Sequence, residues 1–263
     1  MKKMFFIALF LVQNACNVKL SDVHTLSSPD NSIDVIIELK EGELFYSVKK
    51  NNIQIITPSK LGLVTNAFSF DSDISLLSVK RKKSRRSWSQ VWGEQEIIDD
   101  HHNEIFLQFA STDQRKTGVR LKAFDDGIGF RYEIPKGSLP DYEIMDELTE
   151  FNLSEDSPSW WIPAYAYRRY EFLYANTLVS EISRDTYSEL IENLSGPRIG
   201  PEAVQTPFTI ERKDGIVLSI HEANLTDYSS MTLKANGTQN LESDLVPWSN
   251  GVKVYVDSDL QTP

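Results

Sequence analysis

Residues 125–163 read DDGIGFRYEIPKGSLPDYEIMDELTEFNLSEDSPSWWIP. The pair Asp126-Gly127 predicts a tight turn, because aspartate tolerates a positive φ and glycine adopts one without steric strain. Residues 128–134 then alternate between apolar side chains and polar or small ones, which places the apolar side chains on one face of a strand. A strand that leaves a two-residue turn is typical of an antiparallel hairpin.

The same period of two recurs from Ser32 onward. It predicts strands at residues 33–39, 44–48, 53–57, 61–65, 76–80, 105–109, 119–124, 128–134, 208–212, 216–221, 230–235 and 252–256. Turn pairs ending in glycine recur at residues 126–127, 214–215, 236–237 and 250–251. Such turns join antiparallel strands, whereas parallel strands need long crossover connections. The sequence therefore predicts an all-β fold of antiparallel strands, a sandwich or a barrel, in one domain over residues 16–263.

Few and short helices are expected. Only one segment has helical features: Asp185 is a suitable cap for a helix that runs to about Leu194, and Gly196-Pro197 is a stop signal. An irregular insertion over residues 183–201 is the alternative.

The net charge of −11 argues against general affinity for nucleic acid, whose phosphates favour basic surfaces. One basic run, KRKKSRR at residues 80–86, has the opposite character. In an acidic chain we interpret this run as a solvated hairpin loop rather than a phosphate-binding or nuclear-import patch.

The N-terminus has the pattern of an export signal. A basic start, Met1-Lys2-Lys3, precedes an apolar segment at residues 4–12 that is too short to span a membrane. Residues 1–15 are therefore predicted to be removed, either before Cys16 with lipid attached to its sulfur or by ordinary cleavage after Ala15. Both routes predict a periplasmic protein, which contacts a membrane only through a lipid anchor. Cys16 is the one cysteine, so an internal disulfide is excluded.

Trp160 and Trp161 are adjacent, and neighbouring side chains on a strand point to opposite faces. One ring is expected in the core and the other at a domain contact or a sugar-stacking surface. The acidic residues Asp146, Glu147 and Glu150 lie close together on one strand-like segment, whereas a catalytic pair of carboxyls stands across a substrate cleft. We interpret them as a solvated acidic edge and assign no catalytic residue.

Two histidine motifs suit metal binding poorly. His221-Glu222 begins like the zinc-protease motif H-E-x-x-H, but the fifth residue is Leu225. His101-His102 follows two aspartates and is interpreted as a polar hairpin loop, because adjacent side chains seldom share one ion.

Four segments carry a resemblance to a known family: VWGE at residues 91–94, DGIGFRY at 126–132, the stretch 144–151 with WWIP at 160–163, and EANLTDYSSM at 222–231. Together they resemble the N-terminal domain of family-97 glycoside hydrolases, bacterial enzymes that cleave α-linked sugars. The resemblance implies a β-super-sandwich of the galactose-mutarotase type, followed in the whole enzyme by a (β/α)8 barrel that carries the catalytic residues. This chain is expected to stop near the linker into such a barrel.

The resemblance also implies a calcium ion near the catalytic centre, held mostly by the barrel. Glu222 is identified as the ligand that the N-terminal domain supplies, and Asp227 is a weaker second candidate. Carboxylates are the preferred ligands of calcium. The implied substrate is an α-linked oligosaccharide, for which Trp160 and Trp161 are the candidate binding residues.

Three functions remain open. The first is a non-catalytic domain that packs on a catalytic barrel, present in cis or encoded by a split gene, and that shows no glycosidase activity alone. The second is a stand-alone periplasmic carbohydrate-binding module. The third is a mutarotase-like enzyme with His221 or His102 as its acid. Fold likeness does not decide among them, because function depends on the site.

Overall fold

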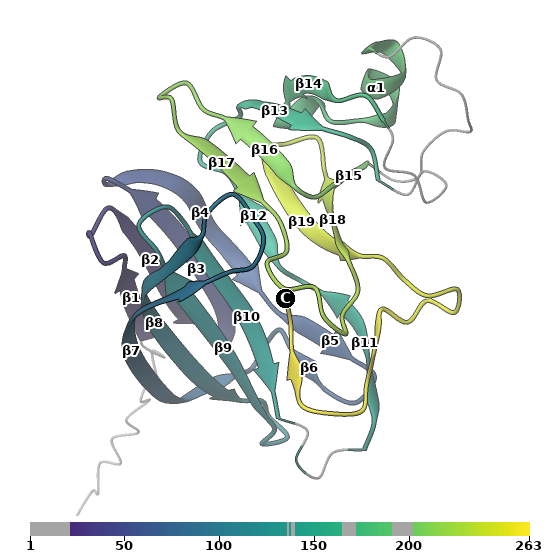
Figure 1. The fold of residues 1–263 in the computed structure, drawn as a ribbon. Coiled ribbons are helices and arrows are strands. Elements are labelled where there is room, and N and C mark those ends of the chain that lie inside the picture. Colours follow the sequence, from purple (N-terminus) through teal and green to yellow (C-terminus); the bar gives the residue numbers. More distant parts are fainter. Residues whose placement is uncertain (1–21, 136, 138–139, 165–171, 191–201) are drawn as a thin grey trace, which may run out of the picture.

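The computed structural model describes residues 22–263 apart from 136, 138–139, 165–171 and 191–201. Within these residues every strand pair is antiparallel, and the strands form five sheets. The predicted all-β antiparallel sandwich is confirmed (Figure 1).

Three sheets come mainly from the first 150 residues. One has the order β1 (Asp22–Ser27), β2 (Ile33–Lys40), β3 (Glu43–Lys50), β4 (Ile53–Leu61). A second has the order β21 (Leu260–Gln261), β10 (Ile128–Ile134), β9 (Lys116–Ala123), β8 (Ile97–Ala110), β7 (Ser75–Ser89). The third has the order β20 (Val254–Val256), β11 (Tyr142–Glu147), β5 (Leu63–Thr65), β6 (Ser69–Phe70).

Two further sheets make up the other half of the molecule, drawn in teal, green and yellow in Figure 1. One has the order β12 (Glu150–Asn152), β19 (Asn240–Leu245), β18 (Met231–Ala235), β15 (Ala203–Gln205). The other has the order β14 (Ala175–Leu178), β13 (Pro158–Trp161), β16 (Phe208–Glu211), β17 (Val217–Ile220). A 3-10 turn η1 (Val179–Glu181) and helix α1 (Arg184–Leu190) follow β14. The helix predicted from Asp185 is confirmed up to Leu190; its predicted end and stop signal lie outside the described residues.

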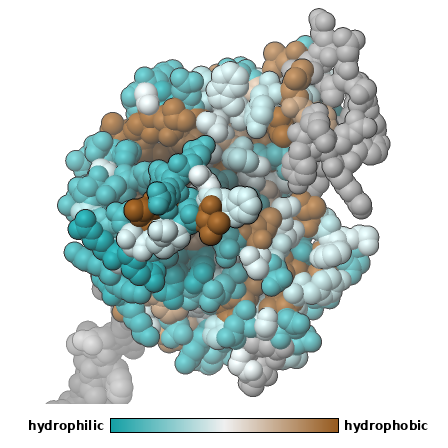
Figure 2. All heavy atoms as spheres, viewed as in Figure 1, coloured by the Kyte–Doolittle hydropathy of each residue, from teal (hydrophilic) through white to brown (hydrophobic). Residues whose placement is uncertain are grey.

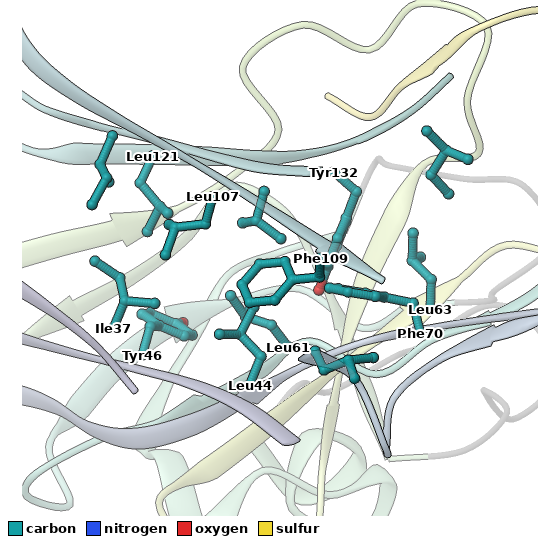
Figure 3. Packing of buried hydrophobic residues seen from close by; sticks show 14 of the residues in the cluster. Ile37, Leu44, Tyr46, Leu61, Leu63, Phe70, Leu107, Phe109, Leu121 and Tyr132 are labelled. Atoms are coloured by element: carbon teal, nitrogen blue, oxygen red, sulfur yellow. The ribbon is translucent and has the colours of Figure 1, made fainter. Parts of the chain in front are cut away.

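Each half of the molecule has its own hydrophobic core. The first packs the inward faces of the three N-terminal sheets, with aromatic rings such as Phe70, Phe109 and Tyr132 in contact (Figure 3). The second surrounds Trp161 and Phe208. Three partly buried residues pack against both cores: Phe130, Leu218 and Met231. The two cores therefore meet at these residues. On the face drawn in Figure 2, apolar residues gather in separate patches among hydrophilic ones.

The interpretation of residues 80–86 as a hairpin loop is wrong. They lie inside β7, which pairs with β8 from Ser75 to Ser89 and forms the free edge of its sheet. Much of β7 has no core to cover, so the apolar alternation that marks a strand is missing there. Charged side chains on an edge strand also prevent it from pairing with another chain.

The loop predicted at His101-His102 is also wrong, because both residues lie within β8. His102 is buried beside the ring of Phe124. Residues 1–21, which include the predicted signal and Cys16, lie outside the described part of the chain. No helix in the described part is long and apolar enough to cross a membrane.

Candidate functional site

A cavity of about 540 Å³ lies where the two cores meet. Phe130, Leu218 and Met231, which pack against both cores, are among its lining residues. Three acidic side chains also line it: Asp126 just before β10, Glu147 at the end of β11 and Glu222 just after β17. The cavity is therefore the candidate site, because it joins an apolar junction to a few convergent polar groups.

Glu222 is held by two hydrogen bonds. Its Oε1 accepts from the backbone N–H of Met231 at 2.6 Å, and its Oε2 accepts from the Thr206 hydroxyl at 2.5 Å. These bonds fasten the loop after β17 to the start of β18 and to the segment between β15 and β16, so the half-buried carboxylate has a fixed position. Among the described residues no group of three His, Cys, Asp or Glu side chains converges to hold a metal ion. Glu222 could therefore supply only part of a calcium site, which needs about 6–8 oxygen ligands.

Glu147 lies in a buried hydrogen-bond network that we call the Glu147 network, made of Gly62, Tyr132, Thr149, Glu147 and Tyr228. The Gly62 N–H donates to the Tyr132 hydroxyl at 2.9 Å, and the hydroxyls of Tyr132 and Thr149 lie 2.9 Å apart. Thr149 donates to Glu147 Oε1 at 2.7 Å, and Tyr228 donates to Glu147 Oε2 at 2.7 Å. The network thus ties the loop that carries Glu222 to β10 and β11.

Burial raises the pKa of Glu147 above its ordinary value of 4.5. The hydrogen bonds from Tyr228 and Thr149 lower this pKa, while the nearby charges of Asp146 and Glu222 raise it further. Burial, together with the charge of Glu147, also raises the pKa values of Tyr132 and Tyr228 well above the usual tyrosine range. Both tyrosines therefore remain hydrogen-bond donors at neutral pH.

The prediction of a solvated acidic edge is wrong for Glu147. Strand β11 shifts register against β5 between Ile144 and Asp146, so one extra residue interrupts the alternation. Tyr142 and Ile144 face the core, and the shift then turns Glu147 inward in place of Asp146. Asp146 and Glu150 remain partly exposed.

The two tryptophans diverge as predicted. Trp161 is 2% exposed, packs on Tyr187 with ring centroids 5.4 Å apart, and donates from Nε1 to the Thr177 hydroxyl at 3.0 Å. Trp160 is 45% exposed. Neither ring lines the cavity that contains Glu222. Asp227 lines a different hollow, so the two candidate calcium ligands are not brought to one cavity.

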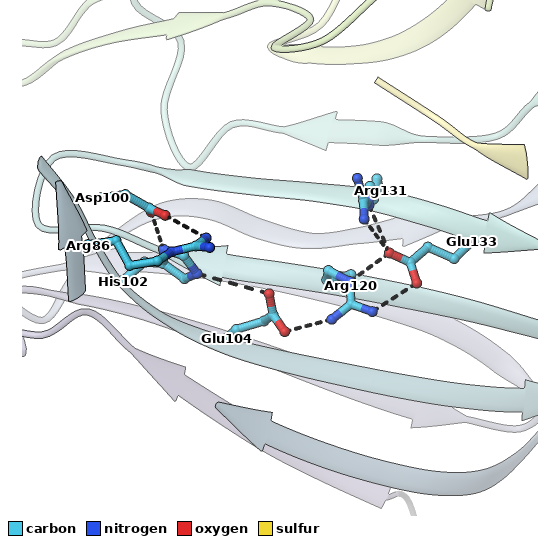
Figure 4. Close-up of polar contacts among 7 residues, drawn as sticks. All are labelled: Arg86, Asp100, His102, Glu104, Arg120, Arg131 and Glu133. Atoms are coloured by element: carbon cyan, nitrogen blue, oxygen red, sulfur yellow. Dashed lines mark hydrogen bonds and ion pairs between the residues drawn. The ribbon is translucent and has the colours of Figure 1, made fainter. Parts of the chain in front are cut away.

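His102 belongs to a row of contacts between basic and acidic side chains (Figure 4). The row lies on the face of the β7–β10 sheet opposite to the buried residues Ile105, Leu107 and Phe109. We call it the outer-face charge chain. Its members come from four strands: Arg86, Asp100, His102, Glu104, Arg120, Glu133 and Arg131. The His102 Nδ1 lies 2.5 Å from Asp100 Oδ1, and its Nε2 lies 4.0 Å from a Glu104 oxygen. Both ring nitrogens thus face carboxylates of the fold.

Comparison with known proteins decides the family. The model of the glycosyl-hydrolase 97 N-terminal family matches residues 26–263. The chain belongs to this family. Among curated proteins, this glycosyl-hydrolase 97 N-terminal chain is 22% identical over 252 residues to a retaining alpha-galactosidase of Bacteroides thetaiotaomicron, covering 94% of this chain and 36% of the relative. It is 25% identical over 133 residues to a probable retaining alpha-galactosidase of Streptomyces bingchenggensis, covering 51% of this chain and 20% of the relative.

Solved structures agree. A glycoside hydrolase family 97 enzyme from Pseudoalteromonas sp. strain K8, in complex with acarbose, superposes with a TM-score of 0.80 at 34% identity, covering 91% of this chain and 34% of that one. A beta-arabinopyranosidase superposes with a TM-score of 0.77 at 20% identity, covering 91% and 39%, which shows the shared fold alone. The chain spans about a third of the length of the Bacteroides thetaiotaomicron alpha-galactosidase and of the Pseudoalteromonas enzyme. This share agrees with a domain from the N-terminal part of a glycosidase.

Proposed function

We propose that this chain is the non-catalytic N-terminal domain of a calcium-dependent α-glycosidase. It packs on a catalytic barrel, in cis or from a separately encoded chain, walls the pocket for an α-linked oligosaccharide, and donates Glu222 to calcium. The observation that carries this proposal is the position of Glu222 at the cavity between the two cores, fixed by Thr206 and Met231. One fixed carboxylate suits a metal whose other ligands come from a second domain.

Three acidic side chains line the cavity, and hydrolysis of a glycosidic bond uses a pair of carboxyls about 5–9.5 Å apart. In Glu147 each oxygen accepts a hydrogen bond from a side chain of the fold, and in Glu222 the two oxygens accept from Thr206 and Met231. Glu147 is also buried. Asp126 is exposed just before β10. Neither Glu147 nor Glu222 is presented to a sugar as an acid and a nucleophile would be, which supports a non-catalytic role.

The test is an assay of the purified chain with aryl α-glucosides and α-galactosides, together with a calcium titration by calorimetry. We expect no hydrolysis and only weak calcium binding, at millimolar concentration or above, that Glu222→Gln removes. Turnover that is lost in both Glu147→Gln and Glu222→Gln would overturn the non-catalytic assignment. Micromolar calcium affinity unaffected by Glu222→Gln would overturn the role of Glu222.

A second candidate, a carbohydrate-binding module that acts alone, is favoured by the exposed ring of Trp160 on β13. An exposed indole offers a flat apolar surface to the C–H face of a sugar. Calorimetry with maltose, isomaltose and an α-galactoside tests it: a binding heat lost in Trp160→Ala supports this candidate, and binding unchanged by that substitution removes it.

We also propose export to the periplasm, on the strength of the basic and apolar pattern of residues 1–15. Mass spectrometry of the mature protein tests the route. An N-terminal Cys16 carrying lipid is expected for the anchored form, and Cys16→Ala then releases the protein from membranes. A mature protein that keeps residues 1–15 would contradict export.

A further inference from the structure

A second, more open hollow of about 1000 Å³ lies apart from Trp160, which is absent from its lining. The loop after β17 borders it with residues 224 and 226–230, and the segment from β19 to β21 borders it with residues 246–248 and 253–261. Asn66, Tyr142 and Glu143 line the side formed by the β20-β11-β5-β6 sheet. Glu222 is not among the lining residues, so this hollow is not the proposed calcium site.

Two exposed aromatic rings line the hollow. Trp248 is 63% exposed and Tyr255 is 54% exposed, with ring centroids 6.4 Å apart and planes inclined at 56°. Two such rings in contact with water contribute little to either core, and together they form an apolar surface inside a polar hollow.

The turn between these rings holds them in place. The backbone N–H of Trp248 donates to Val252 O at 2.8 Å, and that of Gly251 donates back to Trp248 O at 2.9 Å. The Asn250 side chain donates from Nδ2 to the Tyr255 hydroxyl at 2.6 Å. The two rings are therefore pre-organised in the free protein, which lowers the entropy lost when a ligand binds.

Most of the remaining lining residues are polar, and acidic residues outnumber the single cation, Lys253. Carboxyl groups line it at five positions: Asp141, Glu143, Asp227, Asp257 and Asp259. The side-chain amides of Asn66 and Asn224 add both donors and acceptors. Carboxylates and amides are suited to the many hydroxyls of a neutral sugar, and the negative charge disfavours anionic ligands such as uronates or phosphates. Nowhere in the described ranges do three potential ligands converge on a metal.

A buried hydroxyl points to the same ligand class. Tyr142 is one of the residues that line the hollow; its side chain is 2% exposed, and its hydroxyl has no hydrogen-bond partner in the described part of the chain. Burial and the charge of Asp259 raise the pKa of Tyr142 to about 12, so the hydroxyl keeps its proton at neutral pH. A buried donor without an acceptor is unfavourable in the free protein, and a ligand oxygen would satisfy it.

We propose that this hollow binds a pyranose unit of a neutral oligosaccharide, with Trp248 and Tyr255 against the C–H face of the ring and Tyr142 donating to a sugar oxygen. The substrate class rests on the proposed function, whereas the place of the site rests on the aromatic pair and the unsatisfied hydroxyl. The site is separate from Glu222 and from Trp160.

The experiment is a calorimetric titration of the purified chain with maltose, isomaltose and an α-galactoside at millimolar sugar. We expect Trp248→Ala to weaken binding by about tenfold or more, because it removes the larger stacking surface. Trp92→Ala is the matched control, since it removes an exposed indole that lines neither the hollow nor the cavity with Glu222, and it should leave the affinity unchanged. Affinity kept in Trp248→Ala, or lost equally in Trp92→Ala, would overturn the proposal, as would no binding of any of these sugars by the wild-type chain.

The variant Tyr142→Phe distinguishes a role of the hydroxyl in sugar binding from a role in the stability of the fold. It removes a hydroxyl that makes no bond in the free protein, so the thermal midpoint should stay the same or rise, while sugar affinity falls. A lowered midpoint with unchanged affinity would show that the hydroxyl serves the fold and would contradict the proposed contact. The calcium titration and the hydrolysis assay report on Glu222 and on catalysis, so failure here is distinguishable from failure of the proposed function.

Discussion

Two polar networks join strands of this domain in opposite surroundings. The Glu147 network lies at the junction of the two cores and contains one carboxyl that accepts hydrogen bonds from neutral hydroxyls. The outer-face charge chain joins β7 to β10 through charges of both signs (Figure 4). The surroundings of a carboxyl in this protein, more than the number of its hydrogen bonds, therefore decide its pKa and the free energy lost when it is removed.

The two networks shift carboxyl pKa values in opposite directions. Burial raises the pKa of Glu147, since no cation lies beside it in the network. Burial acts in the same direction on Glu133, but hydrogen bonds and charges from Arg120 and Arg131 outweigh it and hold the pKa of Glu133 below 4.5. Asp100 behaves like Glu133, because His102 and Arg86 lower its pKa against the effect of burial.

The largest difference is expected from truncating one carboxyl in each network. Glu147→Ala leaves the hydroxyls of Thr149 and Tyr228 buried without their acceptor and opens a cavity, so it should lower the free energy of unfolding by about 3 kcal/mol. Glu104→Ala, the matched change on the outer face, leaves Arg120 paired with Glu133 and should cost about 1 kcal/mol. Urea unfolding at pH 5 measures both, and equal losses would contradict the comparison.

The next largest effect is expected in the pH dependence of the free energy of unfolding, which should differ between the two networks. Because the pKa of Glu147 is raised in the folded state, its stabilising contribution is complete below pH 4.5 and is lost as the pH rises through the folded pKa. Each pH unit in that window removes up to about 1.4 kcal/mol. Glu147→Gln removes this loss, so the variant should gain stability relative to the wild-type chain as the pH rises above 4.5, as followed by urea unfolding.

Glu133 supplies the control with the opposite sign. Its pKa is lowered by folding, so its contribution is complete above pH 4.5 and is lost as the pH falls. The penalty of Glu133→Gln relative to the wild-type chain should therefore shrink on acidification. If the stability of both Glu133→Gln and Glu147→Gln, relative to the wild-type chain, changed with pH in the same direction, one of the two pKa directions would be wrong.

The smallest effect is expected from salt. Arg120 contacts Glu104 and Glu133 at 2.6 Å each and lies over the Phe106 ring, with 24% of its side chain exposed. Arg120→Met should lower the free energy of unfolding by about 1 kcal/mol at low salt, and by less in concentrated salt, which screens charges. Lys60→Met, which removes a single pair with Glu43, should cost about 0.5 kcal/mol or less. A salt-independent loss in Arg120→Met would point to packing on Phe106 as the cause.

Local sequence predicted much of the fold but less of the candidate site. The divergence of Trp160 and Trp161 follows from the strand period of two, and the structure confirms it. The burial of Glu147 does not follow, because it depends on a register shift against β5, which lies about 80 residues earlier in the chain. The hollow beside Trp248 was not predicted from the sequence either. The position of Trp248, two residues before the predicted Asn250-Gly251 turn, could have indicated an exposed ring.

The amino-acid sequence by itself determined the antiparallel all-β class and the family, because side-chain alternation, turn pairs and short motifs are local properties of the chain. Only the tertiary structure decided that the basic run belongs to an edge strand, that His102 lies between carboxylates, and that Glu147 and Glu222 share a cavity while Asp227 lines another. These outcomes depend on which distant strands become neighbours and in which register, and alternation within one strand carries no information about either.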